Sequence, residues 1–244
     1  MSDTPGVSVV IPVRNEAGNI EPLVTEIERA LTPTGRFEIV YVNDGSTDGT
    51  ARELARLSVT RPWLREIQHA QSCGQSAAVR TGVRAARAPV IITLDGDGQN
   101  DPSFMPAFVS KLAEAGPRCG LVQGQRVGRK DTGFKRFQSR IANRVRSSVL
   151  NDGTRDTGCG FKCFPREVYL SLPYFDALHR FMPALIRREG LEMAYVDVID
   201  RPRLTGVSNY GFFDRLWVGI VDLMGVRWLI KRRKRVPVAT EASR

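Results

Sequence analysis

The sequence predicts an α/β protein built on one mostly parallel sheet with helices on both faces. Through residues 7–125, short apolar runs alternate with segments whose apolar residues recur at helical spacing, and this alternation is typical of parallel sheets. Polar residues gather where the predicted strands end, which is where such sheets bind ligands. With 244 residues, 42% of them hydrophobic and 25% charged, the chain is long enough for a full core.

The predicted strands are short apolar runs bounded by turn residues. They cover residues 7–11, 37–42, 64–68, 90–94 and 121–125. The first is expected to stop at Pro12, because proline cannot donate to a strand ladder. Helices are expected over residues 19–31, 50–57, 76–86 and 102–115. Ser46 or Thr47 can cap the second of these helices.

The chain after residue 126 follows a different pattern. Residues 134–149 form a basic segment of helical spacing, and residues 156–161 form a glycine-rich turn. Helices are expected near 165–172 and 181–189, with a strand near 193–199. Since there is no internal repeat, we predict one domain over residues 1–209 and a C-terminal appendage over residues 210–244.

An unusual acidic loop follows the fourth strand, in the stretch VIITLDGDGQNDP at residues 90–102. A plain turn would explain one Asp and one Gly, but not two carboxylates and a carboxamide, Asp95, Asp97 and Gln99. A hard divalent cation would explain the two carboxylates and the carboxamide together, because such a cation prefers oxygen ligands. An EF-hand is not indicated, since position 12 of that loop would be Pro106 instead of glutamate. The chain also has no P-loop and no Rossmann glycine motif.

A second polar strand end, VNDGSTDGT at residues 42–50, has two readings. Much of it can be a capped turn into a helix, with Asp48 in the first helical turn. Asp44 lies at the carboxyl end of the strand, where it could accept hydrogen bonds from a base or a sugar.

The net charge of +10 indicates an anionic partner: a nucleic acid, an anionic membrane or a phosphate-rich substrate. The basic residues cluster in 126–146 and 227–235. Four cysteines without CxxC spacing or a histidine cluster argue against a zinc site and for reduced cytoplasmic thiols. The N-terminus reaches a strand at once, so no signal peptide is expected.

Four motifs, in this order, resemble glycosyltransferase family 2: VVIPVRNE (9–16), VNDGSTDGT (42–50), LDGDGQNDP (94–102) and DTGCGFK (156–162). Two later segments, HRFMP (179–183) and RPRLTGVSNY (201–210), are similar to dolichyl-phosphate mannosyltransferase and its bacterial polyprenyl-phosphate relatives. The resemblance covers residues 5–235. It implies a GT-A fold, a nucleotide-sugar donor, Mg²⁺ or Mn²⁺, and inversion at the anomeric carbon.

The resemblance also implies roles for individual residues. The nucleotide-sugar site would comprise Pro12, Arg14, Glu16, Asp44, Asp95, Arg203 and Ser208, and the metal ligands would be Asp95, Asp97 and Gln99. Arg126 would hold an anionic substrate group, and Arg136, Ser139 and Arg140 would join it around the acceptor phosphate.

Three departures from the family pattern stand out. Arg14 replaces a usual aromatic and Asn43 a common Asp, which leaves the base identity open. Gly96 and Gly98 replace bulkier residues between the acids, so we expect a looser loop with its ligands intact.

The acceptor decides whether a general base is needed. A hydroxyl acceptor requires one, whereas a lipid phosphate is already anionic near pH 7. The one candidate base is Asp156, which could equally be a turn residue. The resemblance implies catalytic roles for Asp97 and Arg126, and Asp156 joins them as the candidate base. Two or three basic residues of the 126–146 segment are expected to position a phosphate, because the arginine guanidinium binds oxyanions bidentately. The others can simply form a solvated helix face.

The C-terminal segment 210–235 predicts an amphipathic helix with a basic end. On a helical wheel one side carries Trp217, Ile220, Val221, Met224 and Trp228, while Arg215 and Asp222 lie opposite on a narrow polar strip. This pattern fits a helix lying in an anionic membrane interface. Packing on the protein core or across a dimer interface is the alternative, and self-association stays open.

The function that these observations favour is metal-dependent, inverting transfer of a sugar from a nucleotide-sugar to a polyprenyl (dolichyl or undecaprenyl) phosphate at the cytoplasmic face of a membrane. GDP-mannose is slightly favoured as donor, and a UDP-sugar also fits. One alternative is a family 2 transferase with a hydroxyl acceptor on a glycan. A nucleic-acid binder is disfavoured, because few aromatics interleave with the basic residues.

Overall fold

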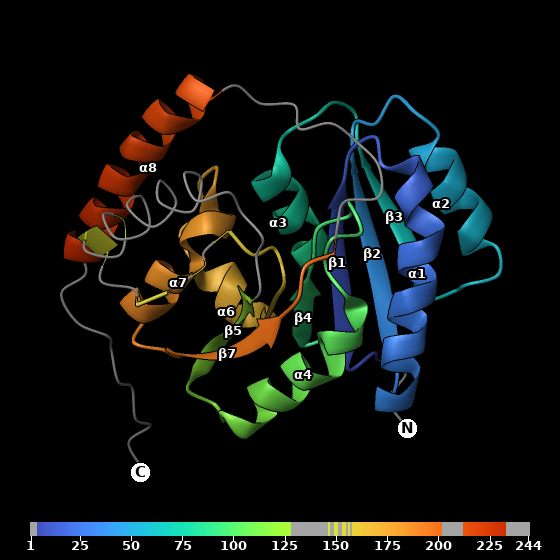
Figure 1. The fold of residues 1–244 in the computed structure, drawn as a ribbon, viewed down its shortest axis with the longest axis horizontal. Helices are drawn as coiled ribbons and strands as arrows, with labels where there is room; N and C mark the ends of the chain where they lie inside the picture. Colours follow the sequence, from blue (N-terminus) through green and yellow to red (C-terminus); the bar gives the residue numbers. More distant parts are fainter. Residues whose placement is uncertain are drawn as a thin grey trace, which may run out of the picture.

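The computed structural model describes residues 4–127, 146, 149–150, 153–154, 156, 158–201 and 212–232. Within these residues, seven strands form one sheet in the order β3-β2-β1-β4-β6-β5-β7 (Figure 1). The strands are β1 (Val7–Val13), β2 (Phe37–Asp44), β3 (Leu64–His69), β4 (Val90–Thr93), β5 (Cys119–Arg126), β6 (Lys162–Pro165) and β7 (Glu192–Val198). All neighbouring pairs are parallel except those of β6, which runs antiparallel to β4 and β5. The predicted fold class is confirmed.

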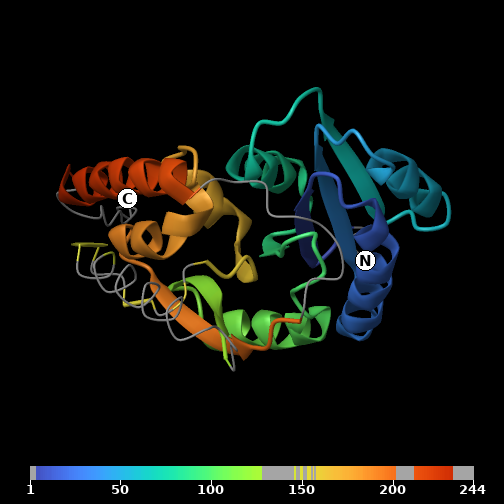
Figure 2. The ribbon, with the colours of Figure 1, turned by 45° about the horizontal axis from the view of Figure 1, so that its top comes forward.

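Helices cover both faces of the sheet, as Figure 2 shows. One face carries α1 (Ala17–Leu31), α2 (Thr50–Ser58) and α4 (Met105–Glu114), the last preceded by the 3₁₀ turn η2 (Pro102–Phe104). The other carries α3 (Gln75–Ala85), α6 (Arg166–Ser171) and α7 (Leu178–Arg188), and α8 (Phe212–Arg232) packs on α7. A further 3₁₀ turn, η1 (Thr32–Thr34), follows α1.

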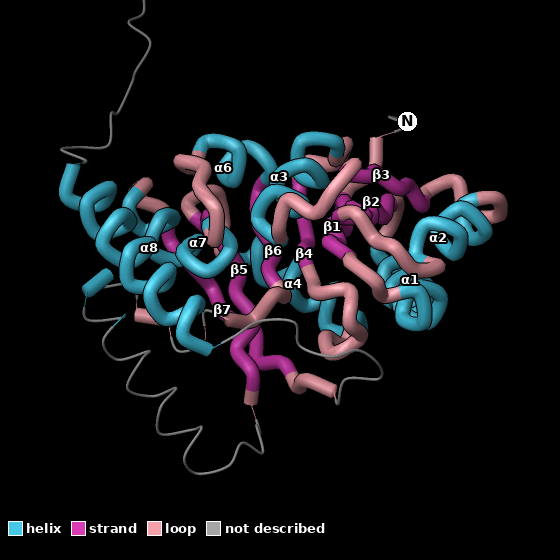
Figure 3. Tube along the Cα trace, turned by 90° about the horizontal axis from the view of Figure 1, so that it is seen from above, coloured by secondary structure: helices cyan, strands magenta, loops and turns pink. Residues whose placement is uncertain are grey.

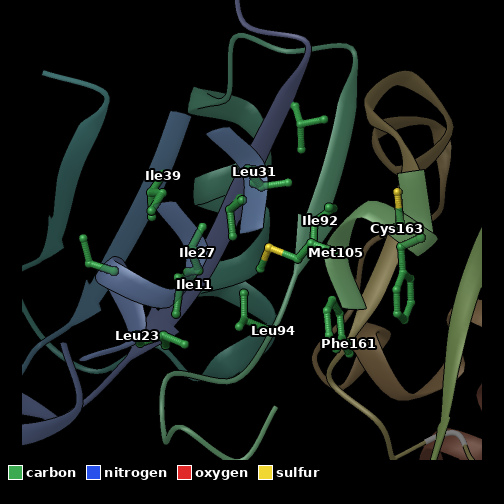
Figure 4. Packing of buried hydrophobic residues seen from close by; sticks show 14 of the residues in the cluster. Ile11, Leu23, Ile27, Leu31, Ile39, Ile92, Leu94, Met105, Phe161 and Cys163 are labelled. Carbon is green, nitrogen blue, oxygen red and sulfur yellow. The ribbon is translucent and has the colours of Figure 1, made fainter. Parts of the chain in front are cut away.

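The two layers of helices explain why the central strands β1, β2 and β4 are mainly apolar. In β1, Val9 and Ile11 face the cluster of α1, while Val10 between them faces the cluster of α3. Figure 4 shows Ile11 packed among side chains of α1 and β2, with Ile27 and Ile39 close by. Burying each such side chain contributes about 1.5–3 kcal/mol, so the strands need apolar residues on both faces.

Strand β1 continues through Pro12, so the expected stop at this residue is wrong. Pro12 is in register with Val42 of β2. On the other side, β4 pairs with β1 only as far as Val10. Pro12 therefore lies beyond the part of β1 that has a strand on both sides, where a missing N–H donor is tolerated.

Strand β6 was not predicted from the sequence. It has only four residues, and it pairs with β4 from Val90↔Pro165 to Thr93↔Lys162 (Figure 3). Because β6 is antiparallel, its first residue lies at the carboxyl end of β4. Most of the basic segment predicted as a helix at 134–149 lies outside the described residues.

Helix α8 presents two different apolar faces. Its exposed face carries the predicted residues Ile220, Val221, Met224 and Trp228, which are 41%, 54%, 68% and 61% exposed. The opposite face packs toward α7 through buried Val226 and its neighbours, and Arg188 Nε donates to Leu229 O at 3.1 Å. This opposite face is mainly apolar and includes half-buried Asp222 of the expected polar strip, while the Arg215 side chain lies outside the described residues. Among the described helices, none combines the length and apolarity that crossing a membrane requires.

Candidate active site

The acidic loop is folded tightly against the end of β1. A Cβ atom at Gly96 would lie 2.3 Å from Val13 Cγ1, and Gly98 adopts a φ of +75°. The loop is closed by hydrogen bonds from the backbone N–H of Asp95 to Asn100 Oδ1 (3.1 Å) and from that of Gln99 to Asp97 Oδ1 (3.1 Å). The glycines therefore permit close packing of the loop against β1, and the expectation of a looser loop stays a prediction.

Asp95 lies in an electrostatically crowded position. Gln75 Nε2, at the start of α3, donates to Asp95 Oδ1 at 2.8 Å, and a Cβ at Gly160 would lie 2.4 Å from its other oxygen. Burial and then the negative charge of Asp97 raise the pKa of Asp95, and the nearby Lys162 and Arg126 offset this only in part. A divalent cation would remove the penalty.

The donor set fits a hard cation. Asp95, Asp97 and Gln99 offer two carboxylates and an amide oxygen on one short loop, and Asp97 is only 7% exposed. Oxygen donors of this kind suit Mg²⁺ or Mn²⁺. The like-charged pair of half-buried Asp95 and buried Asp97 is the observation that favours such an ion.

Arg126, at the end of β5, is held by two carboxylates beside this loop. Its Nε and Nη2 donate to Asp156 at 2.6 and 2.8 Å, and its Nη1 lies 3.4 Å from Asp200 Oδ2. The hydrogen bonds to Asp156 raise the pKa of Arg126. Asp156, predicted as a candidate base, thus has both oxygens bonded to a guanidinium, which is the arrangement of a residue that positions Arg126.

Two further residues of the site were missed from the sequence. Asp200 follows the end of β7, so the rule that ligands bind at carboxyl strand ends could have found it. Lys162, the first residue of β6, is 3% exposed and donates to the Cys159 carbonyl. Burial lowers the pKa of Lys162. Lys162 ends the DTGCGFK motif at 156–162, but no role was assigned to it, because β6 itself was not recognised.

On the other side of the site, Asp44 at the end of β2 is saturated with protein donors. Oδ1 accepts from His69 Nδ1 (2.7 Å) and the Cys73 N–H (2.8 Å), and Oδ2 accepts from Ser72 Oγ (2.8 Å) and the Gly74 N–H (2.9 Å). Burial would raise the pKa of Asp44, but these hydrogen bonds outweigh it and hold the pKa below its ordinary value.

Asp44, His69 and Cys73 place ligand atoms within 4.8 Å of one another, which makes them a candidate cation cluster within the described residues. The hydrogen bonds of Asp44 account for this proximity without an ion. A nucleotide contact by Asp44 would have to replace or add to one of these bonds.

The other predicted nucleotide residues lie at the neighbouring strand end. Pro12 is half-buried, Arg14 is exposed, and Glu16 Oε2 accepts from Asn19 Nδ2 at 2.5 Å. The loop after β1 is tied to the loop after β2, since the Asn15 N–H donates to Ser46 Oγ at 3.0 Å. Five predicted residues lie outside the described residues: Arg136, Ser139, Arg140, Arg203 and Ser208.

Comparison with known proteins identifies relatives along most of the chain. The most similar relatives include a dodecaprenyl-phosphate galacturonate synthase from Rhizobium johnstonii, 32% identical over 94% of this chain and 68% of its own length. Undecaprenyl-phosphate 4-deoxy-4-formamido-L-arabinose transferases from Shewanella sediminis and Pseudomonas paraeruginosa are 30% and 31% identical, over 85% and 84% of this chain. The chain spans 62% and 60% of the length of these two transferases.

Solved structures share the fold at low identity. Glucosyl-3-phosphoglycerate synthase from Mycobacterium tuberculosis, in complex with Mn²⁺, UDP and glucosyl-3-phosphoglycerate, has a TM-score of 0.69 at 19% identity, covering 93% of this chain and 80% of that one. Its complex with Mg²⁺ and UDP gives 0.68. The model of glycosyl transferase family 2 matches residues 8–172, and the chain belongs to that family.

Proposed function

We propose that the protein transfers a sugar from a nucleotide-sugar to a polyprenyl phosphate with inversion, giving a lipid-phosphate-linked sugar. The observation that supports the proposal is the pairing of Arg126 with Asp156. Both carboxylate oxygens of Asp156 accept hydrogen bonds from Arg126. The described site therefore offers a guanidinium that can bind an anion, in place of a free base. An acceptor that is already anionic fits this arrangement, and relatives that are a dodecaprenyl-phosphate galacturonate synthase and undecaprenyl-phosphate transferases support it.

The described residues then take separate roles. Asp95, Asp97 and Gln99 would hold Mg²⁺ or Mn²⁺, which supplies positive charge beside the leaving diphosphate. Asp156 and Asp200 hold Arg126 ready to bind an anionic oxygen. By resemblance, Arg136, Ser139 and Arg140 bind the acceptor phosphate, and Arg203 and Ser208 close over the diphosphate.

We assign a UDP-sugar as the donor, although the sequence slightly favoured GDP-mannose. A guanine would present its N1–H and N2 amine to a carboxylate, whereas uracil presents a single N3–H. Near the ends of β1 and β2, Asp44 and Glu16 already accept protein hydrogen bonds, and Asn43 stands where a further acid is common. The structural neighbours with bound UDP support the same choice.

We place the protein at the cytoplasmic face of a membrane, held by α8. The exposed apolar face of Ile220, Val221, Met224 and Trp228 would enter the interface, and the basic residues that follow would contact anionic headgroups. Because a separate apolar face of α8 packs toward α7, the exposed face is available to lipid.

The test is release of UDP or GDP by purified protein with Mn²⁺ or Mg²⁺, a short polyprenyl phosphate and a panel of UDP- and GDP-sugars. We expect release that depends on the lipid phosphate and on a UDP-sugar, and that is lost in Asp97→Ala. Glu114→Gln, at an exposed position of α4, serves as the matched control. Turnover with a glycan hydroxyl and none with the lipid phosphate would contradict the proposal.

A further inference from the structure

The segment that follows β7 is bonded to the acidic loop by its backbone. The Arg201 N–H donates to the carbonyl oxygen of Gln99 at 2.8 Å. One residue earlier, the Asp200 carboxylate lies 3.4 Å from Asn100 Nδ2 and 3.4 Å from Arg126 Nη1. The loop that carries the candidate metal ligands is therefore fastened to a strand end on the far side of the site.

The Arg201 side chain extends this connection to α1. Its Nη2 lies 2.8 Å from Asp101 Oδ2, and its Nη1 donates to Glu26 Oε2 at 2.7 Å. Asp101 also accepts from the Ser103 N–H at 2.9 Å, which caps η2. One guanidinium thus joins the last acid of the loop to the helix packed beneath it.

We propose that Arg201, together with Asp200, is a positioning latch that sets the geometry of the 95–101 loop for the divalent cation. This inference rests on the proposed function of that loop. The Arg201 side chain does not contact the side chains of the candidate metal ligands. The backbone N–H of Arg201 bonds to the Gln99 carbonyl, and its guanidinium pairs with Asp101. Its predicted role is therefore indirect.

The strength of such contacts argues for positioning over stability. The Arg201 and Glu26 side chains are 39% and 37% exposed, and exposed ion pairs contribute little to the free energy of unfolding. Small displacements of a reacting centre, in contrast, reduce rates by up to about 100-fold. Loss of Arg201 should consequently leave the fold intact while changing the loop.

Arg56→Ala provides the matched control. Arg56 also bridges two acids on the α1–α2 surface, Glu21 at 2.7 Å and Glu53 at 2.6 Å, but it does not touch the acidic loop. Three variants separate the ion pair with Asp101 from the ion pair with Glu26: Arg201→Ala, Arg201→Lys and Glu26→Gln. Lysine can keep one ion pair, and Glu26→Gln removes only the ion pair to α1.

The experiment measures Mn²⁺ binding, melting temperature and amide hydrogen exchange of residues 95–101, the last in metal-free protein. We expect Arg201→Ala to raise the Mn²⁺ dissociation constant about 10-fold and to speed exchange in the loop, with a melting temperature equal to that of Arg56→Ala. Arg201→Lys should recover part of the affinity, and Glu26→Gln should lose less than Arg201→Ala.

Unchanged Mn²⁺ affinity in Arg201→Ala, or an equal loss in Arg56→Ala, overturns the latch. The Mn²⁺ titration needs no sugar donor or lipid. An enzyme inert toward every donor and lipid phosphate would therefore contradict the proposed function, while the titration would still decide the role of Arg201.

Discussion

Two acidic strand ends of the same sheet differ in how their charge is balanced. Asp44, after β2, accepts four hydrogen bonds from the segment 69–74, and its pKa lies below the ordinary value. Asp95, after β4, faces Asp97, and its pKa lies above the ordinary value. The protein's own hydrogen-bond donors balance the charge at the first strand end, whereas the charge at the second is balanced only in part. A carboxylate at a strand end is therefore a sign of metal binding only when the protein leaves its charge uncompensated.

The largest effect that would test this contrast is expected from Asp97→Asn. Removing one of the two paired charges should lower kcat/KM by about 10³-fold without lowering the melting temperature, because like-charge repulsion is relieved. Steady-state kinetics with saturating Mn²⁺ and differential scanning fluorimetry measure the two quantities. A variant that keeps more than a tenth of the activity would rule out Asp97 as a metal ligand.

A smaller loss is expected from Asp156→Asn. If Asp156 only positions Arg126, activity should fall by about 10–100-fold and the pH–rate profile should keep its shape. The measurement is kcat/KM across pH 5 to 9 for both proteins. Disappearance of the ascending limb in the variant would instead make Asp156 the general base and favour a hydroxyl acceptor.

Asp44→Asn should act mainly on stability. An amide in place of the carboxylate leaves partly buried donors such as the Gly74 N–H poorly paired, at a cost of about 2 kcal/mol. For a chain of this size the melting temperature should drop by about 4–8 °C. Ser72→Ala, which removes one of the four bonds, should show a smaller drop. Equal melting temperatures for Asp44→Asn and the parent protein would mean that these bonds do not stabilise the fold.

The smallest effect concerns pH, and its sign is opposite at the two sites. The pKa of Asp95 is raised on folding, so its ionised form destabilises the metal-free protein at neutral pH and the penalty fades as pH falls through the raised value. The pKa of Asp44 is lowered, so its stabilisation is present above the unfolded value and is lost as pH falls through the lowered value.

In EDTA, urea unfolding from pH 3 to 8 should therefore show Asp95→Asn more stable than the parent at pH 7 and equal to it at low pH. The cost of Asp44→Asn should likewise shrink only at low pH. A destabilised Asp95→Asn protein at pH 7 would show that Lys162 and Arg126 already balance the Asp95 charge.

Much of the fold could be predicted because its central strands are buried on both faces. Strand β2 contains the apolar run IVYV at 39–42 and β4 is VIIT, and turn residues follow both strands. Strand β6 was not predicted because its four residues, with a lysine first and a proline last, show no periodic pattern of apolar residues. Pro12 misled for a different reason, since its tolerance depends on how far β4 reaches along β1.

The site residues that lie close together in the sequence were predicted. The contacts that bring distant segments together were missed. Asp95 and Asp97 share one loop, and Arg126 ends a recognisable strand. Asp200 contributes by facing Arg126 across 74 positions of the chain, and the partners of Asp44 come from a loop about 30 positions away. Such pairings depend on strand order, which spacing along the chain does not reveal.

The placement of β6 has a consequence for synthesis on the ribosome. Strands β3, β2, β1 and β4 are complete before residue 100 emerges, yet β4 gains its second neighbour only with residues 162–165. Until then, β4 is an unpaired apolar edge, a template for association with other nascent chains. Residues 162–165, which are made late, therefore cover the exposed edge of the strands that are made first. Chains released after residue 100 and before residue 162 should aggregate and should have no partial activity.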